Sequence, residues 1–171
     1  MLQTFQVPAV PGVHGRPRRW LVALLAALAL GMIIETQAAT TWTVCASGCD
    51  YASIKMATAA STTVDGDTLA IGAGTYTEAG IVVEKNLTLH GERAATSIVQ
   101  ADTTRDRDTA TDRVFTIPSG VTAILQDLTI RYGRFWGYSS GGGLHNSGIL
   151  TLMNSTVSDN STYAGGLDNR G

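Results

Sequence analysis

The sequence predicts an all-β fold, a parallel β-helix (solenoid), on the basis of three observations. Gly is frequent, with 19 of 171 residues, and with abundant Thr this favours extended backbone with many turns over long helices. Short segments alternate apolar and polar side chains with a period of two, as strands do. Residues 142–148 recur 23 positions later as residues 165–171, with five of seven identical. Repeats of this length are typical of solenoids, in which each unit stacks on the next.

The overall composition narrows the class of protein. A hydrophobic content of 44% with 15% charged residues excludes a wholly disordered chain, and 171 residues suffice for one domain. The formal net charge is −2. Nucleic-acid binding would need clustered Lys and Arg, so we expect no nucleic-acid partner.

Residues 1–38 are predicted to be a signal peptide. Three arginines between positions 16 and 19 directly precede the apolar run 20–34. Its fifteen residues match the core of a signal peptide and fall short of the roughly 20 that cross a bilayer. We expect cleavage after Ala38, a secreted or cell-surface protein, and no transmembrane span once the signal is removed. The alternative is an uncleaved membrane anchor.

Residues 39–63 are predicted to form an N-terminal cap. Export would allow Cys45 and Cys49 to form a disulfide, with free thiols or a metal site as alternatives, although a metal would need two further ligands. Residues 51–60 are rich in Ala and lack Gly and Pro, which indicates a short helix with Asp50 as its N-cap. Such a helix would cover the open end of the first coil, or it is an ordinary surface helix.

Residues 64–171 are predicted to form the stacked coils. The strand segments share one apolar and one Thr-rich face, which suits an aliphatic interior: residues 81–84, 86–89, 114–117 and 149–152. A cassette of a polar residue, a variable residue, Thr and an aliphatic residue occurs at residues 86–89, 127–130 and 154–157. Its spacings of 41 and then 27 residues predict loops inserted between turns.

The 23-residue repeat places Asn146 and Asn169 at the same position. Neighbouring strands lie about 4.8 Å apart, so we expect the two amides to form a hydrogen-bonded ladder at a turn. His145 is replaced by Asp168 in the next repeat, which favours an exposed variable position over a catalytic base. The sequence therefore leaves the catalytic residues unidentified.

Residues 65–78 and 85–91 carry a resemblance to a known group. They are similar to the opening module of the right-handed parallel β-helix proteins with the pectin-lyase-like fold. The repeats in the second half resemble the tandem repeats of bacterial surface proteins, including the polymorphic outer-membrane type. The resemblance implies a right-handed coil that serves either for display or as a polysaccharide-active enzyme of the pectate lyase, pectin esterase or glycoside hydrolase type.

The densest charge cluster lies in residues 102–113, which contain three Arg and four Asp, namely Asp102, Asp106, Asp108 and Asp112. Polysaccharide lyases that resemble this fold use carboxylates to hold Ca²⁺ against a uronate, so the resemblance implies a calcium site here. The alternating signs favour the alternative, a solvated loop whose charges neutralise one another. We expect no other cofactor.

An aromatic and basic segment is the predicted recognition site for a ligand. Its members are Arg131, Tyr132, Arg134, Phe135, Trp136 and Tyr138. Aromatic rings on a Gly-rich loop can stack on sugars or anchor a protein partner, with the arginines meeting acidic groups. The alternative is that one or two rings pack onto the coil below.

These observations favour an exported β-helix that displays an adhesin-like surface to an extracellular glycan or surface protein. The first alternative is a polysaccharide-active enzyme whose catalytic coils are missing or unrecognised. The second is a purely structural repeat segment of a larger surface protein. Since the sequence ends at Gly171 just after a repeat start, where a strand should follow, we expect the rest of a longer chain.

Overall fold

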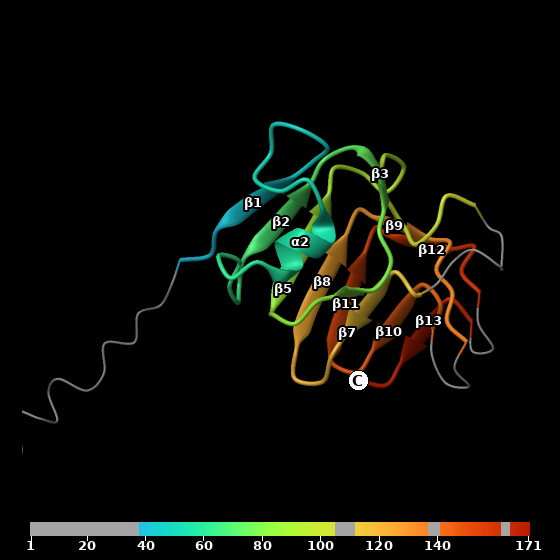
Figure 1. The fold of residues 1–171 in the computed structure, drawn as a ribbon. Helices are drawn as coiled ribbons and strands as arrows, with labels where there is room; N and C mark the ends of the chain where they lie inside the picture. The colour runs from blue at the N-terminus through green and yellow to red at the C-terminus, as the bar shows by residue number, and fades with distance from the viewer. Residues whose placement is uncertain (1–37, 105–111, 137–140, 162–164) are drawn as a thin grey trace, which may run out of the picture. The chain divides into compact units, whose positions relative to one another are not determined.

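The fold was determined as a computed structural model that describes residues 38–104, 112–136, 141–161 and 165–171. These residues belong to one compact unit and contain thirteen β-strands and one short α-helix (Figure 1). Residues 1–37, which hold nearly all of the predicted signal peptide, lie outside the described part of the chain. Within the described ranges, no helix has the length and apolar character needed to cross a membrane.

The strands form three sheets, which we name A, B and C. Sheet A contains, in spatial order, β1 (Thr41–Val44), β2 (Thr68–Ile71), β5 (Leu87–Gly91), β8 (Thr122–Gln126) and β11 (Ile149–Met153). Sheet B contains β3 (Gly74–Thr77), β6 (Ser97–Gln100), β9 (Thr129–Arg131) and β12 (Thr156–Ser158). Sheet C contains β4 (Ile81–Val82), β7 (Phe115–Ile117), β10 (Leu144–Asn146) and β13 (Leu167–Asn169).

The chain visits the three sheets in rotation, so that each coil adds one strand to each sheet. From β2 onward the strands fall in the order A, B, C, and each pairs in parallel with the corresponding strand of the next coil. The all-β prediction and the stacked parallel coils are therefore confirmed, and the protein is a β-solenoid. The 23-residue repeat is the spacing of the last two coils in sheet C, where Leu144 pairs with Leu167.

Aliphatic side chains from successive coils stack inside the solenoid. Leu69 of β2 pairs with Leu89 of β5, which pairs with Leu125 of β8, and all three are fully buried. Burying each such side chain stabilises the fold by about 1.5–3 kcal/mol. The intervening residues point outward, as Thr68 and Thr88 do, so the predicted aliphatic interior is confirmed.

The polar cassettes mark corners of the coil, and one of the three was misassigned. Asp127 and Asn154 lie 27 residues apart at the turn from sheet A to sheet B, with φ angles of 55° and 48°. Short polar side chains tolerate this left-handed conformation, which explains the Asp or Asn at the first position. In the cassette at residues 86–89, residues 87–89 instead lie in β5 of sheet A, where Leu89 pairs with Leu125, so the spacing of 41 residues does not relate equivalent positions.

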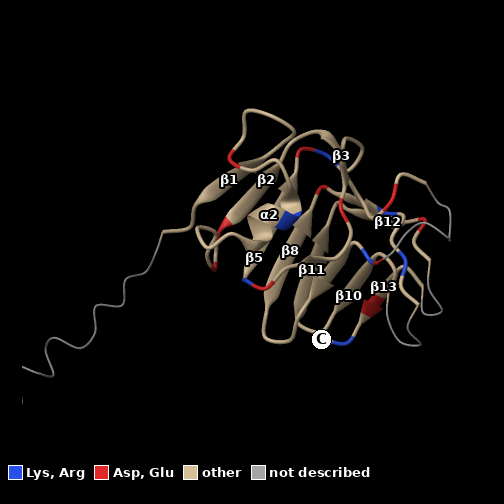
Figure 2. Cartoon of the chain, in the orientation of Figure 1, with Lys and Arg blue, Asp and Glu red and all other residues tan. Residues whose placement is uncertain are grey.

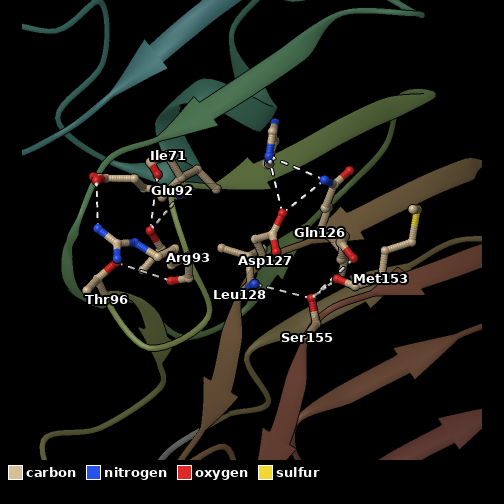
Figure 3. A network of polar contacts seen from close by, with 12 residues as sticks. Ile71, Glu92, Arg93, Thr96, Gln126, Asp127, Leu128, Met153 and Ser155 are labelled. Carbon is tan, nitrogen blue, oxygen red and sulfur yellow. Dashed lines mark hydrogen bonds and ion pairs between the residues drawn. The ribbon is translucent and has the colours of Figure 1, made fainter.

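Side chains from neighbouring coils contact one another at this turn from sheet A to sheet B (Figure 3). Asp127 Oδ2 lies 3.3 Å from His90 Nε2 and accepts a hydrogen bond from Gln126 at 2.9 Å. Ser155, one coil further on, accepts a hydrogen bond from Leu128 N at 3.2 Å. These contacts pair polar groups of the backbone and side chains at the bend with one another. We therefore interpret the cluster as structural.

The predicted helix forms, but it is shorter than expected and has a different N-cap. Helix α2 spans Ile54–Ala59, and Ser53 Oγ accepts a hydrogen bond from Met56 N at the N-cap position. Asp50 is not the N-cap, because its carboxylate accepts hydrogen bonds from Thr43 N and Thr43 Oγ1 at 2.8 and 2.7 Å. The chain between β1 and the helix therefore folds back onto β1 before α2 begins.

The helix lies at the N-terminal end of the solenoid. Its Ile54 and Ala57 are buried in the hydrophobic core, and α2 contacts β1, β2 and β4. Strand β1 lies within the predicted cap segment and forms the edge of sheet A. The loop between β1 and α2 contains a disulfide between Cys45 and Cys49, with their Cα atoms 5.6 Å apart.

Candidate functional site: an aromatic and arginine ledge

The predicted recognition segment begins at a sharp corner after β9. Tyr132 has a φ angle of 57°, and Gly133 follows where a Cβ atom would overlap the carbonyl oxygen of Gly142. Gly133 N donates a 2.8 Å hydrogen bond to Asn160 Oδ1 of the next coil. The corner needs glycine at position 133 because two backbone segments approach there.

Three arginine and aromatic pairs follow one another at this corner. The guanidinium carbon lies 4.6 Å from the ring centroid in the pair Arg131 and Tyr132, 3.4 Å in the pair Arg134 and Trp136, and 3.9 Å in the pair Arg113 and Phe135. We name these six residues the aromatic–arginine ledge. Figure 2 shows basic segments near β10 and β12. Each pair is favoured by cation–π attraction of about 0.5–2 kcal/mol.

Trp136 is the exposed member of the ledge. Its side chain is 67% exposed, whereas the underlying Arg134 is only 7% exposed. Arg134 is fixed by its backbone, which donates a hydrogen bond to the carbonyl of Asp112 and forms a parallel bridge with Ser161. One face of the indole therefore rests on a buried cation while the rest of the residue faces solvent.

Phe135 and Arg131 are bound to the solenoid itself. Phe135 is half-buried over Arg113, and burial lowers the pKa of the Arg113 guanidinium while the carboxylates of Asp112 and Asp168 oppose that shift. Arg131 Nε donates a 2.9 Å hydrogen bond to Gln100 Oε1 on the outer face of sheet B. The sequence left open the alternative that one or two of the aromatic rings pack onto the neighbouring coil. Phe135 does so. Tyr138 lies outside the described residues.

The structure describes two of the four aspartates proposed to hold calcium. Asp102 Oδ1 accepts hydrogen bonds from Thr103, and Asp112 Oδ1 accepts one from Arg113 N. Asp106 and Asp108 lie outside the described residues. Across the described ranges, no three or more His, Cys, Asp or Glu side chains group so that they could hold a metal ion. The calcium site stays a prediction from the resemblance.

Asn146 and Asn169 meet at the corner after sheet C. Asn146 Nδ2 donates a 2.6 Å hydrogen bond to Asn169 Oδ1 on the next coil. The same Asn146 amide exchanges two 3.1 Å hydrogen bonds with the backbone of Gly148. Asn146 is only 2% exposed, so these contacts satisfy a buried polar group as well as joining two coils.

Sequence reasoning missed a second polar cluster, on the outer face of sheet C. His145 is not an exposed variable residue, since its side chain is 18% exposed and contacts Ser147 and Asp168 at 3.1 and 3.0 Å. Asp168 lies 23 residues away and reaches His145 only because β10 and β13 pair in register. The exchange of His145 for Asp168 between the two repeats was the signal in the sequence. It indicates variability when the repeats are compared as copies, and a contact pair when they are stacked as neighbouring strands.

No protein-family model, no curated protein and no solved structure matches the chain.

Proposed function

We propose that the protein is an exported β-solenoid that uses the aromatic–arginine ledge to bind an extracellular glycan. The single observation that carries this proposal is Trp136, a large aromatic side chain that is 67% exposed yet held against the buried Arg134 guanidinium. Export is proposed from the basic and apolar pattern of residues 1–38. The resemblance to right-handed pectin-lyase-like and bacterial surface repeats supports an extracellular display role.

The chemistry of the ledge suits a sugar ring. An indole supplies a large apolar face on which the C–H groups of a sugar can stack, and it has only two rotatable side-chain bonds to immobilise. Arg134 already restricts that freedom, so a smaller entropic cost remains for binding. The positive charges of Arg134 beneath the indole and of Arg131 over the neighbouring Tyr132 ring favour a glycan that carries carboxylate groups.

The test compares the two tryptophans of the described chain. We expect oligogalacturonates to bind the purified protein, as measured by calorimetry, more tightly than neutral galacto-oligosaccharides of equal length. Trp136→Ala should remove this binding and lower the melting temperature by only a few degrees, because the side chain is largely exposed and loses only its cation–π contact with Arg134. The matched control is Trp42→Ala, which removes a core contact and the 2.9 Å hydrogen bond to Asp67, and should lower the melting temperature while the folded protein still binds.

Three outcomes would contradict the proposal. If Trp136→Ala left binding unchanged, the ligand would bind at a site other than the ledge. Ultraviolet-absorbing unsaturated products from polygalacturonate with Ca²⁺ would favour a polysaccharide lyase. A melting temperature lowered by more than a few degrees for Trp136→Ala, with no binding by the parent protein, would favour a purely structural repeat.

A further inference from the structure

A serine, a histidine and an aspartate meet on the outer face of sheet C. Ser147 Oγ lies 3.1 Å from His145 Nε2, and His145 Nδ1 lies 3.0 Å from Asp168 Oδ2. His145 is the middle residue of β10 and Ser147 is the first residue of the bend that follows the strand, which brings the Ser147 hydroxyl against the imidazole. Asp168 comes from β13 and pairs in register with His145. The stacking of two coils therefore assembles the three groups.

The donor and acceptor roles follow from the chemistry of these groups. An ionised carboxylate only accepts hydrogen bonds, so the proton of neutral His145 is on Nδ1 and is donated to Asp168. Nε2 is then an acceptor, and the Ser147 hydroxyl donates to it. In this arrangement the imidazole can take the serine proton during attack on an electrophile, while the carboxylate orients the ring and stabilises its protonated form.

All three groups are partly exposed. The side chains of His145 and Asp168 are 18% and 16% exposed, and Ser147 is partly exposed. Arg170 Nε donates a 3.0 Å hydrogen bond to Asp168 Oδ2, the oxygen that also contacts His145. Asp168 is therefore held from two sides, which fixes its orientation toward the imidazole.

We propose that Ser147, His145 and Asp168 form a nucleophilic site that hydrolyses small carboxylic esters. Ser147 Oγ attacks the ester carbonyl carbon, and the serine proton passes to His145 Nε2. The bond to the alcohol oxygen then breaks, and the alcohol leaves with that proton. Water attacks the acyl-serine with His145 as the base, which releases the carboxylic acid and returns the proton to Ser147.

The backbone around the serine narrows the substrate class. Ser147 N donates to Ile117 O at 2.9 Å, and Gly148 N donates to Asn146 Oδ1 at 3.1 Å. These two amides are therefore already engaged and do not stabilise an oxyanion in this conformation. The site thus suits activated esters, whose leaving groups depart readily, rather than amides. This activity does not depend on glycan binding by the ledge.

The test uses the 171-residue chain and an alkyl fluorophosphonate probe. The reaction joins phosphorus to Ser147 Oγ and releases fluoride, while His145 takes the serine proton. We expect mass spectrometry to find one adduct on the peptide that contains Ser147, and we expect p-nitrophenyl acetate hydrolysis. Ser147→Ala should abolish both, and His145→Gln should slow both by about 10²–10⁴-fold. Ser119→Ala, which changes an exposed turn serine, is the matched control and should react as the parent does.

A second pair of variants separates loss of the base from loss of the fold. Ser147→Cys provides a thiol at the same position, and its alkylation by iodoacetamide should be at least tenfold faster with His145 present than in Ser147→Cys/His145→Gln. Equal alkylation rates, an adduct of undiminished amount in Ser147→Ala, or no adduct in a parent protein whose circular dichroism shows β-structure would each overturn the proposal.

Discussion

Glu78 and Lys85 bind opposite ends of α2, although neither residue belongs to the helix. The Glu78 carboxylate accepts hydrogen bonds from Ile54 N at 3.0 Å and Lys55 N at 2.7 Å. The Lys85 ammonium donates to the carbonyls of Thr58 and Ala60 at 3.0 and 2.7 Å. The negative group lies at the helix N-terminus and the positive group at its C-terminus, the arrangement that the helix dipole favours.

The first prediction concerns this pair. Glu78→Gln should lower the free energy of unfolding by about 1–2 kcal/mol, because a neutral amide accepts the helix N–H groups less strongly than a carboxylate. Urea denaturation followed by circular dichroism measures the change. Glu84→Gln, at an exposed position nearby, is the control and should change it by less than about 0.5 kcal/mol. Equal effects of the two substitutions would show that Glu78 does not cap the helix.

The second prediction concerns acid stability and Asp67. Burial raises the pKa of this carboxyl group, but hydrogen bonds from Val64 N, Thr40 N and Trp42 Nε1 outweigh that effect, and the pKa is lowered overall. Because the folded pKa is depressed, the contribution of Asp67 to stability is present above the unfolded pKa of about 3.9 and is lost as the pH falls through the folded value.

The measurement for Asp67 is the difference in unfolding free energy between the parent and Asp67→Asn. We expect the parent to be more stable near pH 7, and we expect the difference to shrink as the pH falls below about 4. The difference removes the contribution of other carboxylates, which titrate in both proteins. A difference that grows on acidification would contradict the lowered pKa.

The third prediction concerns the amide ladder. Asn146→Ala should destabilise the fold by about 2 kcal/mol, since it leaves buried backbone groups of Gly148 without partners. Asn169→Ala should cost less, about 0.5 kcal/mol, because Asn169 is exposed. The double variant should lose less stability than the sum of the two single-variant losses. The difference, which is the coupling between the two amides, should be about 0.5–1 kcal/mol. Strict additivity would mean that the two amides do not interact.

Much of the solenoid could be predicted from the sequence because its signals are local. Alternating side chains such as those around Leu87 and Leu89 report which face of a strand is buried, and the 23-residue repeat reports the size of one coil. The register between other coils was harder to predict from the sequence. The segment between β6 and β7 lengthens one coil to 36 residues, from Leu89 to Leu125. The similar sequences of residues 86–89 and 127–130 therefore suggested equivalent positions, although the first segment belongs to a strand of sheet A and the second to a strand of sheet B.

The clusters of side chains depended on that register and were less predictable. Arg113 lies far from Phe135 in sequence and covers its ring only in the folded coil. The contact of His145 with Asp168 required the pairing of β10 with β13, which the repeat contained. Alignment of the two repeats as stacked strands, rather than as variable copies, would have identified that pair.

The register of adjacent coils is the central claim, and cysteine cross-linking tests it most directly. His90 and Gln126 point outward and pair in register across β5 and β8, so their Cα atoms lie about 4.8 Å apart, within disulfide range. Thr122 begins the same strand β8, four residues before Gln126 and therefore about 13 Å away along it.

In a Cys45→Ser/Cys49→Ser background, we expect His90→Cys/Gln126→Cys to form a disulfide rapidly under mild oxidation. His90→Cys/Thr122→Cys should remain reduced under the same conditions, as measured by mass spectrometry of the intact folded protein. Preferential cross-linking of the second variant would indicate antiparallel strands and would contradict the stacked parallel coils.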